Sequence, residues 1–217
     1  MPLYGVANFD NIKKLLSLLE ICHQCNALPY CTSQEDRSII RHQSYKDRYI
    51  RYYVKKYYSF ILKDLSLIGF ESSDTGYYYF QTPFTNLKYY LDKYNLYDDD
   101  FIQHSDFMLD ELENRNHPFY LRYDYSEDQY KEGQHPAAHI HLGVDSPIRL
   151  SCKYKLKPMS FILFVLRQFY PDEWTRLLTY GENIPEVNVV LKSVRDNLEP
   201  ISTDFLSGWN LHEMHLE

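Results

Sequence analysis

Three short segments between residues 117 and 153 constrain the fold most strongly, because polar and apolar side chains alternate along each of them. The first runs from His117 to Tyr125, the second from His135 to Gly143, and the third from Pro147 to Lys153. Alternation with a period of two is the pattern of a β-strand with one buried face. We therefore predict three strands and expect them to be neighbours in a mostly antiparallel sheet.

The alternation also assigns chemically active side chains to one face of each predicted strand. If the strands are neighbours, two arginines, one aspartate and two histidines converge on a single polar patch. Neither the register nor the outward face of a strand is fixed by sequence, so this convergence is a hypothesis. The candidate catalytic residues are Tyr120, Arg122, Asp124, His135, His139, His141 and Arg149.

Histidine is the side chain whose ordinary pKa lies nearest neutrality, so a pair on one strand can act as an acid and a base. In a metal-independent ribonuclease, His139 or His141 would take the proton from a ribose 2′-hydroxyl. Another group, His135 or Tyr120, would protonate the leaving oxygen. RNA is the substrate this hypothesis favours, in a toxin or a phage-defence effector.

The charged neighbours of the histidines fit the same hypothesis. Arg122 or Arg149 would offset the negative charge that develops on the phosphorane, and Asp124 would orient a histidine. The ordinary alternative is that the strand histidines are hydrogen-bonded to neighbours and have no chemical role.

The same residues also permit a metallohydrolase, in which a divalent metal is bound by His139, His141 and either His135 or Asp124. The arginines argue against this site, because they repel a cation unless they contact a substrate phosphate. We therefore expect no obligatory cofactor, with a divalent metal as the alternative. A third hypothesis is a binding or accessory subunit without catalysis, whose partner is a protein encoded nearby and whose tyrosines and arginines form the interface.

A basic segment between residues 37 and 63 contains eight cations and one acid, although the whole chain has a net charge of −7. Tyrosines are interleaved with these cations, a pattern that suits a phosphate backbone and stacked bases. Alternatively, the segment pairs with the chain's own acidic stretch between Asp92 and Glu111. The candidate nucleic-acid-binding residues are Arg48, Arg51, Tyr52, Lys55 and Lys56.

The chain has 217 residues, of which 44% are hydrophobic and 17% aromatic, so we predict one packed α+β domain over residues 1–217. Helical patterns precede and follow the predicted strands, and the first helix is expected to extend to about Cys25. We find no Walker loop, Rossmann fingerprint or nucleophile elbow. Four sparse cysteines, no apolar run of about 18 residues and no signal-peptide pattern predict a cytoplasmic protein without membrane contact.

Five stretches resemble a bacterial family known as domain of unknown function 2290. They are Lys63–Phe70, Tyr120–Asp124, His135–Gly143, Pro158–Phe161 and Phe169–Pro171. The resemblance covers most of the chain and implies a bacterial cytoplasmic protein, but it supplies no mechanism. The arrangement of Arg122, Asp124 and the His-x-His pair is also similar, over about 35 residues, to small antitoxin-controlled ribonucleases.

Overall fold

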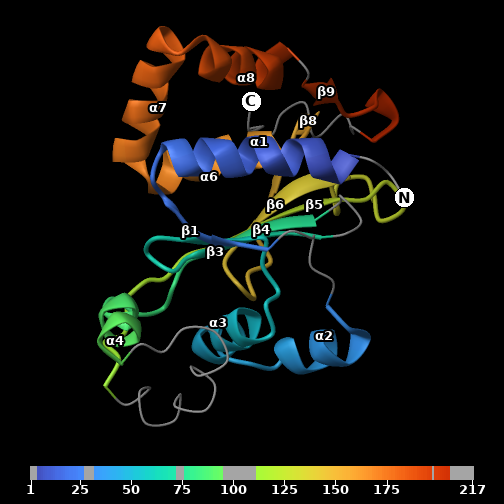
Figure 1. Ribbon diagram of the computed structural model, residues 1–217. Coiled ribbons are helices and arrows are strands. Elements are labelled where there is room, and N and C mark those ends of the chain that lie inside the picture. Colours follow the sequence, from blue (N-terminus) through green and yellow to red (C-terminus); the bar gives the residue numbers. More distant parts are fainter. Residues whose placement is uncertain (1–3, 27–31, 72–75, 95–110, 197, 206–217) are drawn as a thin grey trace. The chain divides into compact units, whose positions relative to one another are not determined.

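The computed structural model describes residues 4–26, 32–71, 76–94, 111–196 and 198–205, and these residues form an α+β fold (Figure 1). This confirms the predicted fold class. The helices are α1 (Tyr4–Leu18), α2 (Gln34–Ile40), α3 (Tyr45–Val54), α4 (Leu87–Tyr94), α6 (Pro158–Phe169), α7 (Pro171–Asn183) and α8 (Pro185–Asp196), with a short 3₁₀ turn at Thr203–Phe205. Within these residues, no helix combines the length and the apolar character that a membrane span needs.

Seven strands form one antiparallel sheet whose spatial order follows the chain, β1-β2-β3-β4-β5-β6-β7. They are β1 (Cys22–Cys25), β2 (Phe60–Leu62), β3 (Leu67–Phe70), β4 (Gly76–Phe80), β5 (Tyr120–Tyr125), β6 (Ala138–Leu142) and β7 (Arg149–Ser151). The last three are the strands that the alternation predicts, and they are neighbours. A separate pair joins β8 (Tyr154–Lys155) to β9 (Glu199–Pro200).

The chain divides into two compact units. Unit 1 consists of the described parts of residues 1–22, 73–77 and 121–217, and unit 2 of the described parts of residues 23–72 and 78–120. The expectation of one domain over residues 1–217 stays a prediction.

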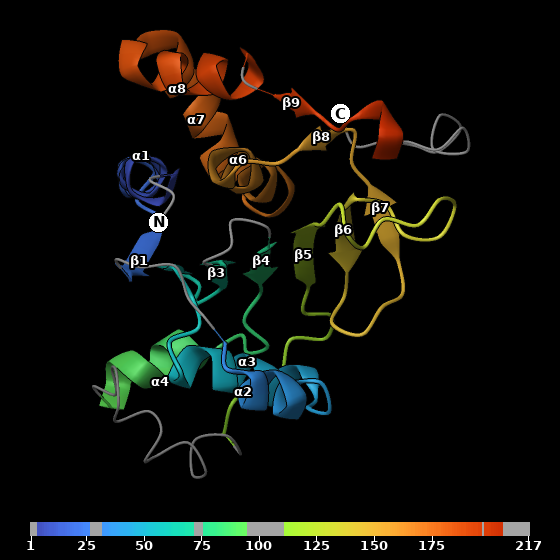
Figure 2. The same cartoon turned by 90° about the vertical axis from the view of Figure 1, so that its right-hand side faces the viewer.

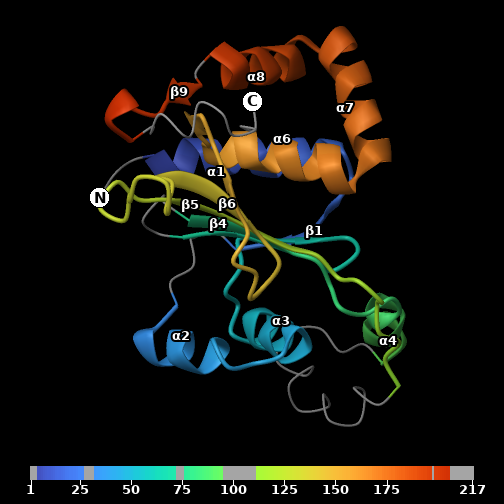
Figure 3. The ribbon, with the colours of Figure 1, turned by 180° about the vertical axis from the view of Figure 1, so that it is seen from behind.

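Unit 1 is built around an aromatic stack that links its strands to a helix. The ring of Tyr123 on β5 stacks on that of Tyr77 at 5.4 Å, and Tyr77 contacts Phe161 of α6 at 5.7 Å. Helices α1 and α6 lie side by side (Figures 1 and 3), and the views in Figures 2 and 3 show α6 leading into α7 and α8. Since successive side chains of a strand point to opposite faces, Asp124 lies on the face that does not carry this stack.

Unit 2 buries the tyrosines of its basic segment in its own core. Tyr49 of α3 is fully buried, and its hydroxyl donates a hydrogen bond of 2.6 Å to the carbonyl of Leu65. The hydroxyl of Tyr45 lies 2.8 Å from the carbonyl oxygen of Gln81. Rings at the i, i+4 positions of α3 therefore pack inward, where Tyr49 meets Phe80 edge to face at 5.6 Å.

The first helix ends earlier than its sequence pattern predicts, so Cys22 and Cys25 lie on strand β1 and not on a helix. The cause is a Schellman motif, in which the N–H of Ile21 bonds to the carbonyl of Leu16 and that of Glu20 to Ser17. Glu20 takes the left-handed conformation, with a φ of 55°. Glycine is the usual residue there, so the sequence lacks the signal that normally marks such an end.

Candidate metal centre

The register of the three predicted strands builds the site. Strand β6 pairs with β5 so that His139 faces Asp124 and His141 faces Arg122. On its other side β6 pairs with β7, where Arg149 faces His141. Directly opposed residues of an antiparallel pair point to the same face, so all five side chains lie on one face of unit 1. The structure thus confirms the convergence that the alternation predicts.

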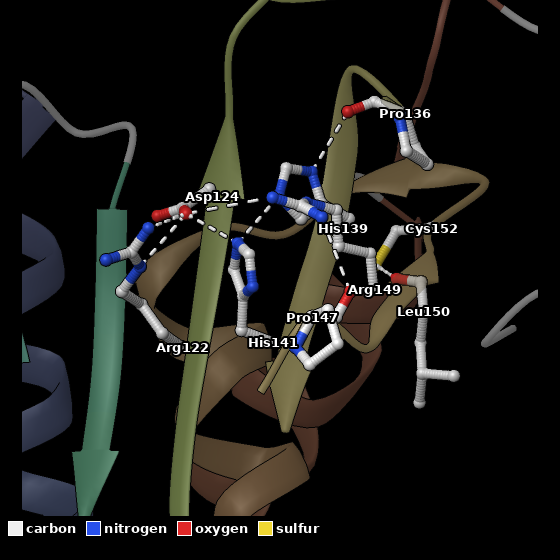
Figure 4. A network of polar contacts seen from close by, with 9 residues as sticks. All are labelled: Arg122, Asp124, Pro136, His139, His141, Pro147, Arg149, Leu150 and Cys152. Carbon is white, nitrogen blue, oxygen red and sulfur yellow. Dashed lines mark hydrogen bonds and ion pairs between the residues drawn. The ribbon is translucent and has the colours of Figure 1, made fainter. Parts of the chain in front are cut away.

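Three potential ligand atoms point toward one another on this face (Figure 4). The Nε2 atoms of His139 and His141 are 2.9 Å apart, and Nε2 of His141 is 3.2 Å from Oδ2 of Asp124. The third distance, from His139 Nε2 to the same oxygen, is 4.0 Å. A point equidistant from the three atoms in their plane lies about 2.0 Å from each. Bonds from zinc to imidazole nitrogen and carboxylate oxygen are roughly 2.0–2.2 Å long.

A backbone hydrogen bond fixes the tautomer of His139. Its Nδ1 lies 2.9 Å from the carbonyl oxygen of Pro136. Since a carbonyl only accepts, Nδ1 carries the proton and the neutral ring turns an unprotonated Nε2 toward the centre. Ligand histidines in metalloproteins are usually held in this way, by a hydrogen bond from the other ring nitrogen to a carbonyl or carboxylate.

With this tautomer, Nε2 of His139 and Oδ2 of Asp124 are both acceptors on either side of His141, and Oδ2 also accepts from Arg122. Nε2 of His141 can offer one hydrogen between these two acceptors. One N–H at that position cannot make two full-strength hydrogen bonds. A cation between the three atoms would give the Nε2 atoms of both histidines a partner at once, beside the carboxylate of Asp124.

Asp124 is held as a carboxylate by its neighbours. Nε of Arg122 donates to Oδ2 of Asp124 at 2.9 Å, and Nη2 of Arg122 donates to the same oxygen. Burial acts to raise the pKa of Asp124, but the hydrogen bond from His141 and the charge of Arg122 outweigh it and bring that pKa below its ordinary value. The carboxylate side chain remains 25% exposed, which leaves it open to solvent.

Burial makes His139 a neutral ligand at physiological pH. Its side chain is 2% exposed, and this burial, reinforced by the charge of His141, lowers its pKa to about 4. The pKa of His135 is also lowered, first by burial and then by the charges of Arg149 and His141. A neutral imidazole binds metals, whereas it has no second proton to give as a general acid.

Two further candidates lie around these ligands. The ring of His135 meets that of His139 edge to face at 4.7 Å, and its Nδ1 is buried without a hydrogen-bond partner among the described residues. Arg149 is exposed, and its Nη1 donates to the carbonyl of Pro147 at 3.3 Å. Both residues therefore flank the three-atom cluster and do not belong to it.

Tyr120 has a different environment from the other candidates. It is 6% exposed and assigned to unit 2, where its ring lies 4.9 Å from Phe80 and stacks on Tyr78 at 6.2 Å. These contacts favour a structural role, and its proposed role as a proton donor stays a prediction.

The basic segment likewise has mainly internal contacts. Arg48 is buried and bonds to the carbonyl of Gln43, while Arg51 forms a 2.8 Å ion pair with Asp36 of α2. Tyr52 packs edge to face on Tyr57, Tyr78 and Phe80. Lys55 is the C-cap of α3 and Lys56 follows it, and both are exposed. Nucleic-acid binding by this segment stays a prediction, and most of the acidic stretch, residues 95–110, lies outside the described residues.

A cavity of about 230 Å³ lies beside the centre in unit 1. It is lined by Tyr130, Lys131, Gly133, Gln134, Pro136, Pro147 and Arg149. Sequence reasoning missed Lys131 and the carbonyl of Pro136. The available signal for Lys131 was its place in the long loop between the first two predicted strands, because loops at sheet ends often carry functional residues. A backbone carbonyl leaves no such signal.

Comparison with known proteins places the chain in a family without adding a function. Residues 18–204 match the model of a family described as an uncharacterized conserved protein, DUF2290. No curated protein and no solved structure gives a significant match, so neither comparison supports the likeness to small ribonuclease toxins. The match covers most of the chain and includes every ligand of the candidate centre, and the chain therefore belongs to the DUF2290 family.

Proposed function

We propose that this protein is a metal-dependent hydrolase whose divalent cation is bound by Asp124, His139 and His141. The observation that carries the proposal is the convergence of three ligand atoms on a point about 2.0 Å from each. The hydrogen bond from His139 to Pro136 supports it, since it aims an unprotonated nitrogen at that point.

Two histidines and one carboxylate suit zinc, manganese or ferrous iron better than magnesium or calcium, which prefer oxygen ligands. Three protein ligands also leave a coordination position open, as catalytic sites require. A divalent cation held in this way would lower the pKa of a bound water toward neutrality and so would supply a hydroxide nucleophile. Arg122 and Arg149 on the same face favour a substrate that is an anion.

One observation favours a second candidate, a metal-free phosphodiesterase. Arg122 donates two hydrogen bonds to Oδ2 of Asp124, the oxygen that a cation would need. Without a metal, Asp124 and His141 form a 3.2 Å pair in which the carboxylate orients the imidazole as a general base. The arginines would then offset the charge that develops on a phosphodiester such as RNA.

Metal binding by the purified protein tests the first proposal. After treatment with EDTA and its removal, Zn²⁺ and Mn²⁺ are titrated calorimetrically into the wild type and into Asp124→Asn and His141→Gln. We expect one site per chain in the wild type and at least a tenfold weaker site in each variant. Asp128→Asn and His117→Gln are matched controls on exposed residues and keep the wild-type affinity.

Activity separates the two candidates. Bis(p-nitrophenyl) phosphate and mixed RNA are offered to the protein with Mn²⁺, with Zn²⁺ and with excess EDTA. Hydrolysis that needs the metal and disappears in Asp124→Asn supports the metallohydrolase. EDTA-resistant cleavage that His141→Gln abolishes establishes the metal-free mechanism instead. A wild type that binds neither metal refutes the metal centre.

We also propose a cytoplasmic location. Cys25 and Cys152 form no disulfide within the described residues, and reduced cysteines are typical of the cytoplasm. Alkylation of these thiols in freshly lysed cells, without added reductant, tests this part of the proposal. Disulfide-linked forms at this step would contradict it.

A further inference from the structure

We propose that the cavity beside the candidate centre is an anion subsite, in which Lys131 and Arg149 bind a phosphoryl group of the substrate. This inference rests on the proposed function and names the substrate class as a phosphate ester. The cavity belongs wholly to unit 1, like the three ligands.

The cavity shares two of its walls with the metal centre. Pro136 lines it and also provides the carbonyl that holds His139. Arg149 lines it and faces His141 across the β6–β7 pair. Figure 4 shows Pro136, Pro147 and Arg149 grouped around the two histidines. A ligand in the cavity is therefore next to the point on which the three ligand atoms converge.

The lining is chemically suited to an oxyanion. It offers a guanidinium, an ammonium, a phenol and an amide, and it contains no carboxylate. Within the part of the chain that the structure describes, neither Lys131 nor Arg149 forms an ion pair with an acid. Both side chains are exposed, so their charges are available to a ligand. The planar fork of an arginine matches two phosphate oxygens, and a lysine adds a compact charge.

The backbone of Lys131 is fixed to the segment that carries the ligands. Its N–H donates to the carbonyl of His135 at 3.0 Å, and the N–H of His135 donates back to the carbonyl of Lys131 at 2.8 Å. Gly133 permits the tight turn between them, because its φ of +65° lies in the left-handed region. The turn thus fixes the backbone from which the Lys131 side chain extends, close to His135 and Pro136.

The size of the cavity limits what enters it. At about 230 Å³ it is smaller than the pockets of roughly 300–1,000 Å³ that enclose drug-sized ligands. It accommodates a phosphoryl group with a small part of its ester. A longer substrate extends out of the cavity, and its scissile phosphate alone occupies this position.

Inorganic phosphate is the probe that tests the subsite. Binding to the EDTA-treated protein is measured by calorimetry, so that the result does not depend on the metal. We expect Lys131→Gln and Arg149→Gln each to raise the dissociation constant by about tenfold, as the loss of one charge-assisted hydrogen bond predicts. Lys192→Gln and Arg167→Gln remove exposed cations from α8 and α6 and leave the dissociation constant unchanged.

A second measurement places the phosphate relative to the centre. Bound Mn²⁺ broadens the ³¹P resonance of a nearby phosphate, so we expect strong broadening in the wild type. At concentrations near the wild-type dissociation constants, the broadening is reduced in Asp124→Asn because metal binding is weaker, and in Arg149→Gln because phosphate binding is weaker.

The outcomes of the two proposals are distinguishable. Phosphate binding that is equal in the wild type, Lys131→Gln and Arg149→Gln overturns the subsite, as does a wild type that binds Mn²⁺ but no phosphate. Phosphate binding that needs both cations, in a protein that binds no metal, supports the subsite and overturns the metal centre alone. Circular dichroism of each variant confirms that loss of binding is not loss of fold.

Discussion

Acidification provides a quantitative test of the environment of His139. Its ring is almost fully buried and its pKa is lowered from 6.5 to about 4, mainly by burial and then by the charge of His141. The folded protein therefore binds this proton at a lower pH than the unfolded chain does. Stability from this group is present at neutral pH and is lost as the pH falls from about 6.5 toward 4.

The size of the loss follows from the difference between the two pKa values. One pKa unit corresponds to about 1.4 kcal/mol, so complete protonation removes about 3 kcal/mol of unfolding free energy. Integration between pH 7 and pH 5 gives a loss of about 2 kcal/mol. The lowered pKa of Asp124 acts in the same direction, but at more acidic pH.

Urea unfolding in the presence of EDTA measures this loss for the wild type, His139→Gln and His117→Gln at pH 7 and pH 5. His117 is exposed, so His117→Gln is the matched control and retains the wild-type pH dependence. We expect His139→Gln to lose about 2 kcal/mol less than the wild type over this range. An equal loss in His139→Gln would falsify the assignment of a neutral, buried imidazole to this position.

Three further changes test the local structure, each by urea unfolding at pH 7. Glu20→Gly is expected to raise the unfolding free energy by about 1 kcal/mol, because glycine adopts the left-handed conformation without strain. The control Ser17→Gly, within the helix, lowers the unfolding free energy by about 0.5 kcal/mol. A lower unfolding free energy in Glu20→Gly contradicts the Schellman motif at the end of α1. Tyr49→Phe leaves the buried carbonyl of Leu65 without its donor and costs about 1–2 kcal/mol, and a neutral effect refutes that bond. Ser44→Ala removes the N-cap of α3 and costs about 1 kcal/mol; unchanged stability argues against the cap.

The strands of the site could be predicted because their chemically active residues recur every two positions, which is also the spacing of side chains on one face of a strand. Arg122 and Asp124 are two residues apart, as are His139 and His141, so each pair had to lie on one face of its strand. Antiparallel neighbours then require only short connections. The convergence of these four side chains was accessible to sequence reasoning for that reason.

The register and the ligand geometry could not be predicted. Pairing Asp124 with His139 is one of several registers that keep the same faces, and the choice depends on contacts made along the whole sheet. The orientation of the His139 ring depends on the carbonyl of Pro136, a group that every residue has. Sequence reasoning therefore reached the residues of the centre but not the directions of their atoms.

The basic segment shows the opposite difficulty, because one pattern permits two interpretations. Tyr45, Tyr49 and Tyr53 recur every four residues, which indicates one buried face of a helix. The neighbouring cations indicate instead a surface that binds the phosphate backbone of a nucleic acid. Tyr49 and Tyr53 are buried, and Tyr45 contacts Phe80 edge to face. A tyrosine stripe at helical spacing is consistent with a core face whenever its hydroxyls can reach backbone carbonyls, as those of Tyr45 and Tyr49 do.

The pairing of Asp124 with His139 has a consequence for how this family can vary in length. Gain or loss of one residue inside β5 or β6 turns the following side chains to the other face and disperses the ligands. Residues 127–136 lie beyond the last backbone hydrogen bond of this pair, from the N–H of Ser126 to the carbonyl of Ala137, and changes of length outside the turn of Lys131 leave the pairing intact. Natural insertions and deletions are therefore expected to collect in that connection, while β5 and β6 keep a constant length across homologues.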